Sequence, residues 1–92
     1  TLNLASGMGA YTLSDRASWI NFNNKGDLYI TSEKHTALFN QYGVTLVNPS
    51  RCPNVKFKNA EKFINWLISK TGQKAIQNFK LKNQQLFFPN AD

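Results

Sequence analysis

The feature that most constrains the fold is an apolar stripe in the second half of the chain. Its residues recur every three or four positions: Ala60, Phe63, Ile64, Leu67 and Ile68. This spacing places them on one face of an α-helix, and that face must be covered by other parts of the protein. Asn59 stands immediately before the stripe. We expect it to be the N-cap, because its side-chain oxygen can accept a hydrogen bond from a free backbone N–H group.

A second helix is expected directly after the first. Ser69 can cap it with its hydroxyl oxygen. The residues directed toward the core would then be Ala75, Ile76 and Phe79. Gly72 is ambiguous, since a glycine at this position could equally end the first helix.

Shorter elements are expected along the rest of the chain. Residues 1–6 read as the end of a helix that stops at the glycines after it. Residues 23–27, Asn-Asn-Lys-Gly-Asp, form a turn, and residues 28–31 read as a short strand. Residues 42–47 alternate with apolar side chains on both faces, which is typical of a strand covered by helices. Residues 86–88 can dock as an extended tail, so the expected class is mixed α/β.

Residues 9–19, Gly-Ala-Tyr-Thr-Leu-Ser-Asp-Arg-Ala-Ser-Trp, form a dense polar segment. The spacing of Thr12 and Asp15 matches a capping box, in which Thr12 would be the N-cap and Asp15 would reach back to it. A second interpretation uses the same residues. Backbone N–H groups at a helix start attract anions, and Thr12, Ser14 and Arg16 add hydrogen-bond donors. The residues alone leave both a helix start and an anion-binding segment open.

Composition limits the size and class of the protein. A chain of 92 residues is enough for one compact domain and too short for two, and 41% hydrophobic residues can build a core. The single cysteine, Cys52, excludes an internal disulfide and a multi-cysteine zinc site. No run approaches the roughly 18 apolar residues of a membrane span. The chain begins with Thr1, so we expect a mature or excised fragment of a longer protein.

The formal charge of +6 is concentrated in the second half of the chain. Eight lysine and arginine residues lie between Arg51 and Lys82, and Glu61 is the one acid among them. Lysines attract phosphates and aromatic rings can stack on bases, so a basic module that binds nucleic acid or another polyanion is an alternative function. However, lysines opposite an apolar stripe are typical of any soluble helix, and most of the aromatic residues are needed for the core. No nucleic-acid partner is therefore expected.

Catalytic chemistry finds little support in the sequence. A nucleophile needs a neighbouring base, and the only histidine, His35, stands in a loop-like segment without a flanking motif. A metal site needs several His, Cys or carboxylate ligands, which five scattered acids and one histidine do not supply. No phosphate-binding or dinucleotide-binding glycine pattern occurs. We therefore expect a protein that is not an enzyme, with no catalytic residues, no bound metal and no cofactor.

Three separate segments resemble one known family. The segment "TLNLASGMGAYTLSDRASW" is similar to T-L-N-M-A-x-x-x-G-A-Y-T-L-T-D-R-x-T, and "LFNQYGVTLVNP" to L-F-N-x-Y-G-V-x-x-V-N-P. The segment "AEKFINWLISKTGQKAIQNF" is similar to F-x-x-W-L-x-S-x-x-G-Q-x-x-I. These are patterns of the tungstate-binding (TupA-like) substrate-binding proteins of bacterial ABC transporters. The resemblance covers essentially all 92 residues in order, with mild departures such as Ser14 for the usual Thr and Ala17 for the usual Gly.

The resemblance implies part of a type 2 periplasmic-binding-protein fold, with a few short strands packed with about four helices. In that fold two α/β lobes close on tungstate or molybdate. This chain would be a C-terminal fragment, with residues 1–39 from the second lobe, residues 40–43 as the hinge crossing and residues 44–92 returning to the first lobe. The hinge candidates are Asn40, Tyr42 and Gly43. The resemblance also implies a periplasmic location, a monomer, and the membrane permease of an ABC transporter as partner.

Four residues of the polar segment stand at signature positions of the family: Tyr11, Thr12, Asp15 and Arg16. They are candidates either for the oxyanion cleft or for organising the lobe and its hinge. Two anion-binding stretches of the family do not occur in this chain, so we expect the fragment alone to bind tungstate weakly or not at all. Tungstate and molybdate are nearly the same size, which leaves the preference between them open.

Overall fold

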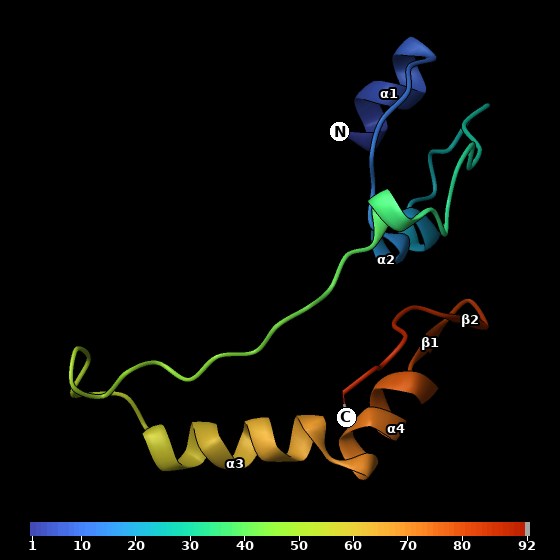
Figure 1. The fold of residues 1–92 in the computed structure, drawn as a ribbon. Helices are drawn as coiled ribbons and strands as arrows, with labels where there is room; N and C mark the ends of the chain where they lie inside the picture. The colour runs from blue at the N-terminus through green and yellow to red at the C-terminus, as the bar shows by residue number, and fades with distance from the viewer. Residues whose placement is uncertain (92) are drawn as a thin grey trace.

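The computed structural model describes residues 1–91 and confirms the α/β class with four α-helices and a two-stranded sheet. The elements in chain order are α1 (Leu2–Met8), α2 (Arg16–Asn21), the 3-10 turn η1 (Thr36–Leu38), α3 (Phe57–Ile68), α4 (Lys70–Asn78), β1 (Lys80–Leu81) and β2 (Gln84–Gln85). The two strands pair antiparallel, with Lys80 opposite Gln85 and Leu81 opposite Gln84. Figure 1 shows the N-terminal elements at one end and α3 and α4 at the other.

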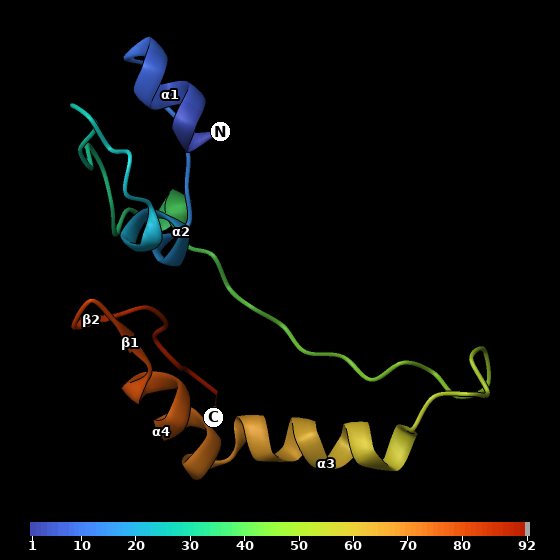
Figure 2. The same cartoon turned by 180° about the vertical axis from the view of Figure 1, so that it is seen from behind.

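The chain is open rather than compact. Figure 2 shows an extended segment that leaves η1 and runs to the start of α3, which then returns toward α4 and the hairpin. The radius of gyration is 17.6 Å, whereas a compact domain of this length has about 12 Å. The accessible surface is 7937 Å², against about 5,400 Å² for a folded monomer of this mass. The excess accessible surface is larger than the total area that a standard protein–protein interface buries, about 1,600 Å².

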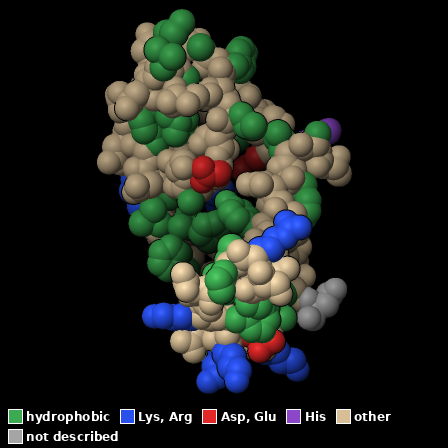
Figure 3. Space-filling view, turned by 90° about the vertical axis from the view of Figure 1, so that its left-hand side faces the viewer, with side chains coloured by type: hydrophobic (Ala, Val, Ile, Leu, Met, Phe, Trp, Pro, Cys, Tyr) green, Lys and Arg blue, Asp and Glu red, His purple; other side chains and the backbone are tan. Residues whose placement is uncertain are grey.

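The core is correspondingly small. Ala5, Ile20 and Leu86 are the buried apolar side chains among residues 1–91, at 4%, 5% and 6% exposure. Large apolar side chains remain exposed on α3 and on the extended segment before it. Figure 3 shows hydrophobic side chains in a band across the middle of one face, with most of the Lys and Arg side chains of that face below it. The described residues therefore do not cover their own apolar surface.

The end of α1 agrees with the sequence. Gly9 caps the helix in the left-handed conformation, with φ 62°, which glycine adopts without the steric cost of a Cβ atom. The backbone N–H of Ala10 then donates to the Ala5 carbonyl at 3.0 Å. The prediction of a helix ended by glycines is confirmed, although the helix continues to Met8 rather than Ser6.

The predicted capping box of α2 is wrong in its register. Asp15, not Thr12, is the N-cap, and its carboxylate accepts from the Ser18 backbone N–H at 2.9 Å and from the Ser18 hydroxyl at 2.6 Å. The Thr12 hydroxyl reaches only the Leu13 carbonyl, at 3.5 Å. Aspartate is among the strongest N-cap residues, so the helix begins at Arg16, directly after it.

The corner between α3 and α4 shows one correct prediction and one wrong one. Ser69 caps α4 as predicted, and its hydroxyl oxygen accepts from the Gly72 N–H at 3.1 Å. Gly72 therefore lies inside α4 and does not end α3. Asn59 is not the N-cap of α3: the helix starts at Phe57 after Lys56, whose side chain makes no cap hydrogen bond.

The two predicted strands are not observed. Within residues 1–91, neither 28–31 nor 42–47 pairs with another strand, and a β-strand needs a partner that completes its hydrogen-bonded ladder. The observed strands instead form a tight hairpin at Lys82 and Asn83, whose φ values of 49° and 63° suit a two-residue turn. The strand prediction missed this hairpin.

The predicted inward residues are only partly buried. Leu86 docks as predicted, but Phe88 is 66% exposed. On α4, Ile76 is half-buried, whereas Ala75 and Phe79 are exposed. These helix positions face outward because no other element in the described part of the chain covers them.

Candidate functional site

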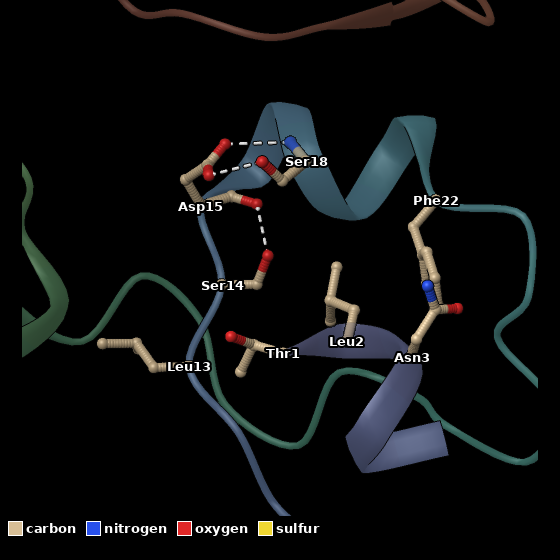
Figure 4. Close-up of a pocket in the computed structure, with 8 residues that line it drawn as sticks. All are labelled: Thr1, Leu2, Asn3, Leu13, Ser14, Asp15, Ser18 and Phe22. Carbon is tan, nitrogen blue, oxygen red and sulfur yellow. Dashed lines mark hydrogen bonds between the residues drawn. The ribbon is translucent and has the colours of Figure 1, made fainter. Parts of the chain in front are cut away.

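The polar segment that resembles the family signature forms one wall of an open hollow between α1 and α2. Figure 4 shows the side chains that line it: Thr1, Leu2, Asn3, Leu13, Ser14, Asp15, Ser18 and Phe22. Its volume is about 490 Å³. The extended backbone of residues 10–14 brings the signature alongside the first turn of α1, because Gly9 reverses the chain at the end of that helix.

Both serines that line this hollow donate to Asp15, and the Asn3 oxygen accepts from the Asn24 side chain at 3.2 Å. The Ser14 hydroxyl donates to the Asp15 carbonyl at 3.1 Å, and the Ser18 hydroxyl donates to the Asp15 carboxylate. The Ser18 hydroxyl and backbone N–H lower the pKa of Asp15 below its ordinary value of 3.8. Asp15 therefore carries a negative charge at neutral pH, and a carboxylate at the rim repels an oxyanion. The polar side chains of Asp15 and Ser18 in this hollow therefore cap α2.

Arg16 joins the signature to the opposite end of the chain. Its Nε donates to the backbone carbonyl of Gln85 in β2 at 2.8 Å, across 69 residues of sequence. One terminal nitrogen lies 3.9 Å from the Glu33 carboxylate, and the guanidinium carbon lies 5.8 Å from the centre of the Phe88 ring. The contacts with Gln85 and Phe88 hold α2 against β2 and the tail after it, whereas the contact with Glu33 joins α2 to the loop before η1.

The other two signature candidates lie apart from this contact. Tyr11 and Thr12 belong to the extended approach to α2, and the Tyr11 side chain is 91% exposed. The structure thus brings Asp15 and Arg16 together at the start of α2, with different partners. Tyr11 and Thr12 keep their side chains toward the outside of the described chain.

The hinge candidates lie on the extended segment after η1. Asn40 and Gly43 are exposed, and no heavy atom lies within 4 Å of a Cβ placed on Gly43. The Tyr42 ring packs edge-on against Phe87 with a centroid distance of 5.7 Å and an interplanar angle of 89°. Gln41, which the sequence analysis did not single out, pairs with Asn90 through two side-chain hydrogen bonds. A partner 49 residues away leaves no local signal in the sequence.

Catalytic and metal chemistry gain no support from the geometry. The His35 side chain accepts a hydrogen bond from the Ala37 N–H at 3.1 Å and so caps η1. Cys52 is exposed and unpaired with another cysteine. Among residues 1–91, no three His, Cys, Asp or Glu side chains gather where they could hold a metal ion. None of the described helices is long and apolar enough to cross a membrane.

The whole chain superimposes on part of a solved structure, the tungstate-binding protein TupA from Desulfovibrio alaskensis G20. The TM-score is 0.81 and the sequence identity 43%, over 100% of this chain and 38% of that one. The chain is TupA-like. This similarity confirms the resemblance that the three sequence segments indicate.

Other relatives agree with this assignment. The TupA-like chain is 38% identical to the tungstate-binding protein TupA of Peptoclostridium acidaminophilum over 98% of its length. It is 41% identical, over 99% of its length, to a Haloferax volcanii protein named as a candidate ABC transporter anion-binding protein. It spans only 32% and 28% of these two relatives. No protein-family model matches the chain.

Proposed function

We propose that this chain is part of the solute-binding component of an ABC-type uptake system for tungstate or molybdate. The observation that carries the proposal is the similarity to TupA over the whole chain, at 43% identity and with the same fold. The relatives are named for binding an anion and not for catalysis, which supports a protein that is not an enzyme. The chain would carry part of the binding cleft, since it corresponds to 38% of the solved relative.

The proposed division into lobes is the one that the family resemblance implies. Residues 1–39 would belong to the second lobe, residues 40–43 would cross between the lobes, and residues 44–92 would belong to the first. The uncovered apolar face of α3 and the unpaired residues 44–47 support this division, because each would be completed by further elements of a lobe. A sheet neighbour beside residues 44–47 would also supply the missing ladder hydrogen bonds.

We propose different roles for the four signature residues. Asp15 caps α2 and would organise the second lobe, whereas Arg16 bonds from α2 to the hairpin and would connect the two lobes. Tyr11 and Thr12 have exposed side chains with hydroxyl groups, and these two are the candidates for the cleft. Oxyanion capture would then use neutral N–H and O–H donors together with an arginine from outside this segment, and lobe closure would remove the bound dianion from water.

The remaining proposals concern the cellular setting. Relatives named as ABC transporter and tungstate-binding proteins support a membrane permease as the partner that receives the anion. A periplasmic location and a monomeric state follow from the same proposal. The exposed lysines of α3 and α4 would be a solvated face, and no nucleic-acid partner is proposed.

Titration calorimetry tests the proposed function. The full native polypeptide that contains this segment is titrated with tungstate, molybdate and sulfate, and the 92-residue segment is titrated in parallel. We expect micromolar or tighter affinity of the full polypeptide for tungstate or molybdate, and weak or no binding by the segment. Absence of binding to both metal oxyanions by the full polypeptide would refute the proposal.

A gel shift at low salt tests the polyanion alternative. If the lysines of α3 and α4 formed a nucleic-acid site, the full polypeptide would retard single-stranded DNA, and the shift would weaken steeply with salt. We expect no shift. A salt-sensitive shift without any oxyanion binding would make the alternative the better account of the chain.

A further inference from the structure

Two amide side chains from distant parts of the sequence pair beside the hinge candidates. The side-chain N–H of Gln41 donates to the Asn90 oxygen at 3.2 Å, and the Asn90 N–H donates to the Gln41 oxygen at 2.7 Å. This reciprocal pair connects the extended segment after η1 to the C-terminal tail. Each amide group uses both its donor and its acceptor in the pair.

Gln73 fastens the same tail to the corner between α3 and α4. Its side-chain N–H donates to the Leu67 carbonyl at 2.8 Å, at the end of α3. Its side-chain oxygen accepts from the Ala91 backbone N–H at 3.0 Å. One half-buried residue of α4 therefore holds both the helix corner and the residue that follows Asn90.

An aromatic contact lies next to the amides. Tyr42 follows Gln41, and its ring meets Phe87 edge-on at 5.7 Å, three residues before Asn90. Aromatic pairs favour an edge-on geometry because the positive edge of one ring faces the negative face of the other. The two passages of chain thus touch at two successive residues of the extended segment.

We infer that Gln41, Gln73 and Asn90 are positioning residues. They form an amide clasp that joins the extended segment after η1 to the C-terminal tail, and the tail to α4. Residues 39–47 make no strand pairing in the described chain, so side chains rather than a backbone ladder fix this passage to the tail, which Gln73 in turn fixes to α4. The inference rests on the proposed function in one respect: if residues 40–43 join two lobes, the clasp helps to set the angle between them, together with the Arg16–Gln85 and Lys82–Asn23 hydrogen bonds. It would then control how readily the lobes close on the anion.

A length exchange between the two paired amides tests the clasp in the full native polypeptide. Gln41→Asn shortens one side chain and Asn90→Gln lengthens the other, so each single variant separates or crowds the amides, while the double variant restores their total reach. The matched control is Gln77→Asn, an exposed glutamine on α4. Tungstate affinity is measured by calorimetry, and the tungstate-induced decrease in radius of gyration by small-angle scattering.

We expect each single variant to weaken tungstate binding about threefold to tenfold, the range that one or two neutral hydrogen bonds give. The double variant should recover to within about twofold of the unmodified protein, and its closure on tungstate should recover with it. The control should stay within about twofold. A double variant whose loss equals the product of the two single losses would overturn the clasp, whatever the melting temperatures do.

Amide hydrogen exchange separates failure of the clasp from failure of the proposed function. Gln73→Leu removes the acceptor of the Ala91 N–H, whereas Gln73→Glu keeps an acceptor and removes the donor to Leu67. We expect exchange at Ala91 to accelerate about tenfold in Gln73→Leu, as a lost hydrogen bond allows, and to stay slow in Gln73→Glu. Unchanged exchange in both variants would overturn the clasp even in a protein that binds tungstate. If the unmodified protein binds no oxyanion, the proposed function fails, and this exchange measurement still decides whether the clasp exists.

Discussion

The region around α2 buries its central apolar side chain, whereas the region around α3 leaves its large apolar side chains exposed. At α2, Ile20 is buried, Arg16 bonds to Gln85, and the Lys82 ammonium donates to the Asn23 side chain at 2.9 Å. At α3, Phe63 is 58% exposed and Trp66 is 45% exposed, although both rings stack on one another at 6.3 Å. The difference shows that the α2 region finds its partners within this chain, whereas residues 1–91 leave the apolar face of α3 uncovered.

The largest expected effect comes from the apolar face of α3. In the full native polypeptide, Phe63→Ala should lower the free energy of unfolding by about 3–5 kcal/mol, the cost of truncating a buried aromatic side chain. In the isolated 92-residue segment the same change should cost less than about 1 kcal/mol, because little buried area is lost there. Urea unfolding of both proteins measures the two values.

Lys62→Ala is the matched control for this face, since Lys62 is exposed beside Phe63 in the sequence. It should change the stability of either protein by less than about 0.5 kcal/mol. Equal costs for Phe63→Ala in both proteins would break the comparison between the two regions.

The second effect concerns the corner at which α3 meets α4. A Cβ atom on Gly72 would overlap the backbone carbonyl of Trp66 and lie 2.9 Å from that of Leu67. Gly72→Ala should therefore destabilise the full polypeptide by about 2–3 kcal/mol, because the overlapping atoms are backbone and the two helices must move apart. Thermal unfolding measures the loss.

Gly7→Ala in α1 provides the opposite case. No heavy atom lies within 4 Å of a Cβ at Gly7, and the residue is helical. The change should stabilise the protein by about 0.5–1 kcal/mol, since alanine loses less conformational entropy in a helix than glycine does. Destabilisation by Gly7→Ala would show that α1 is more closely packed than this structure has it.

The third effect concerns the hydrogen bond by which Arg16 joins α2 to the hairpin. Arg16→Lys keeps the charge but loses the planar donor fork, so the bond to the Gln85 carbonyl and the contact with the Phe88 ring should both weaken. We expect a loss of about 1–2 kcal/mol in the free energy of unfolding. A loss of tungstate affinity at unchanged stability would instead place Arg16 in the cleft.

The smallest effect is a pH dependence from the cap of α2. The Ser18 hydroxyl lowers the pKa of Asp15 in the folded state, so the cap contributes stability above about pH 4 and loses it as the pH falls through the lowered folded pKa. The contribution should be no more than about 1 kcal/mol, because the cap is exposed to solvent. Asp15→Asn should flatten the stability profile between pH 5 and pH 2, measured by urea unfolding at each pH. An unchanged slope in Asp15→Asn would show that another carboxylate causes the pH dependence of stability.

Local chemistry explains which predictions succeeded. The glycines after α1, the Ser69 cap and the helical stripe of α3 each depend on residues within a few positions of one another. The family resemblance succeeded for a related reason, since it also depends on short runs of residues in a fixed order. The capping box failed because two capping residues three positions apart compete, and only the backbone conformation decides between Thr12 and Asp15.

By itself, the sequence determined the glycine end of α1, the Ser69 cap of α4, the helical stripe of α3 and the kinship with tungstate-binding proteins. The tertiary structure alone decided that Arg16 bonds to Gln85 and that Gln41 pairs with Asn90, across 69 and 49 residues. It also decided that residues 42–47, which alternate like a strand, remain without a ladder in the described chain. The physical reason is that caps and stripes are satisfied by neighbours in sequence, whereas strand pairing and long-range hydrogen bonds depend on where folding places another segment.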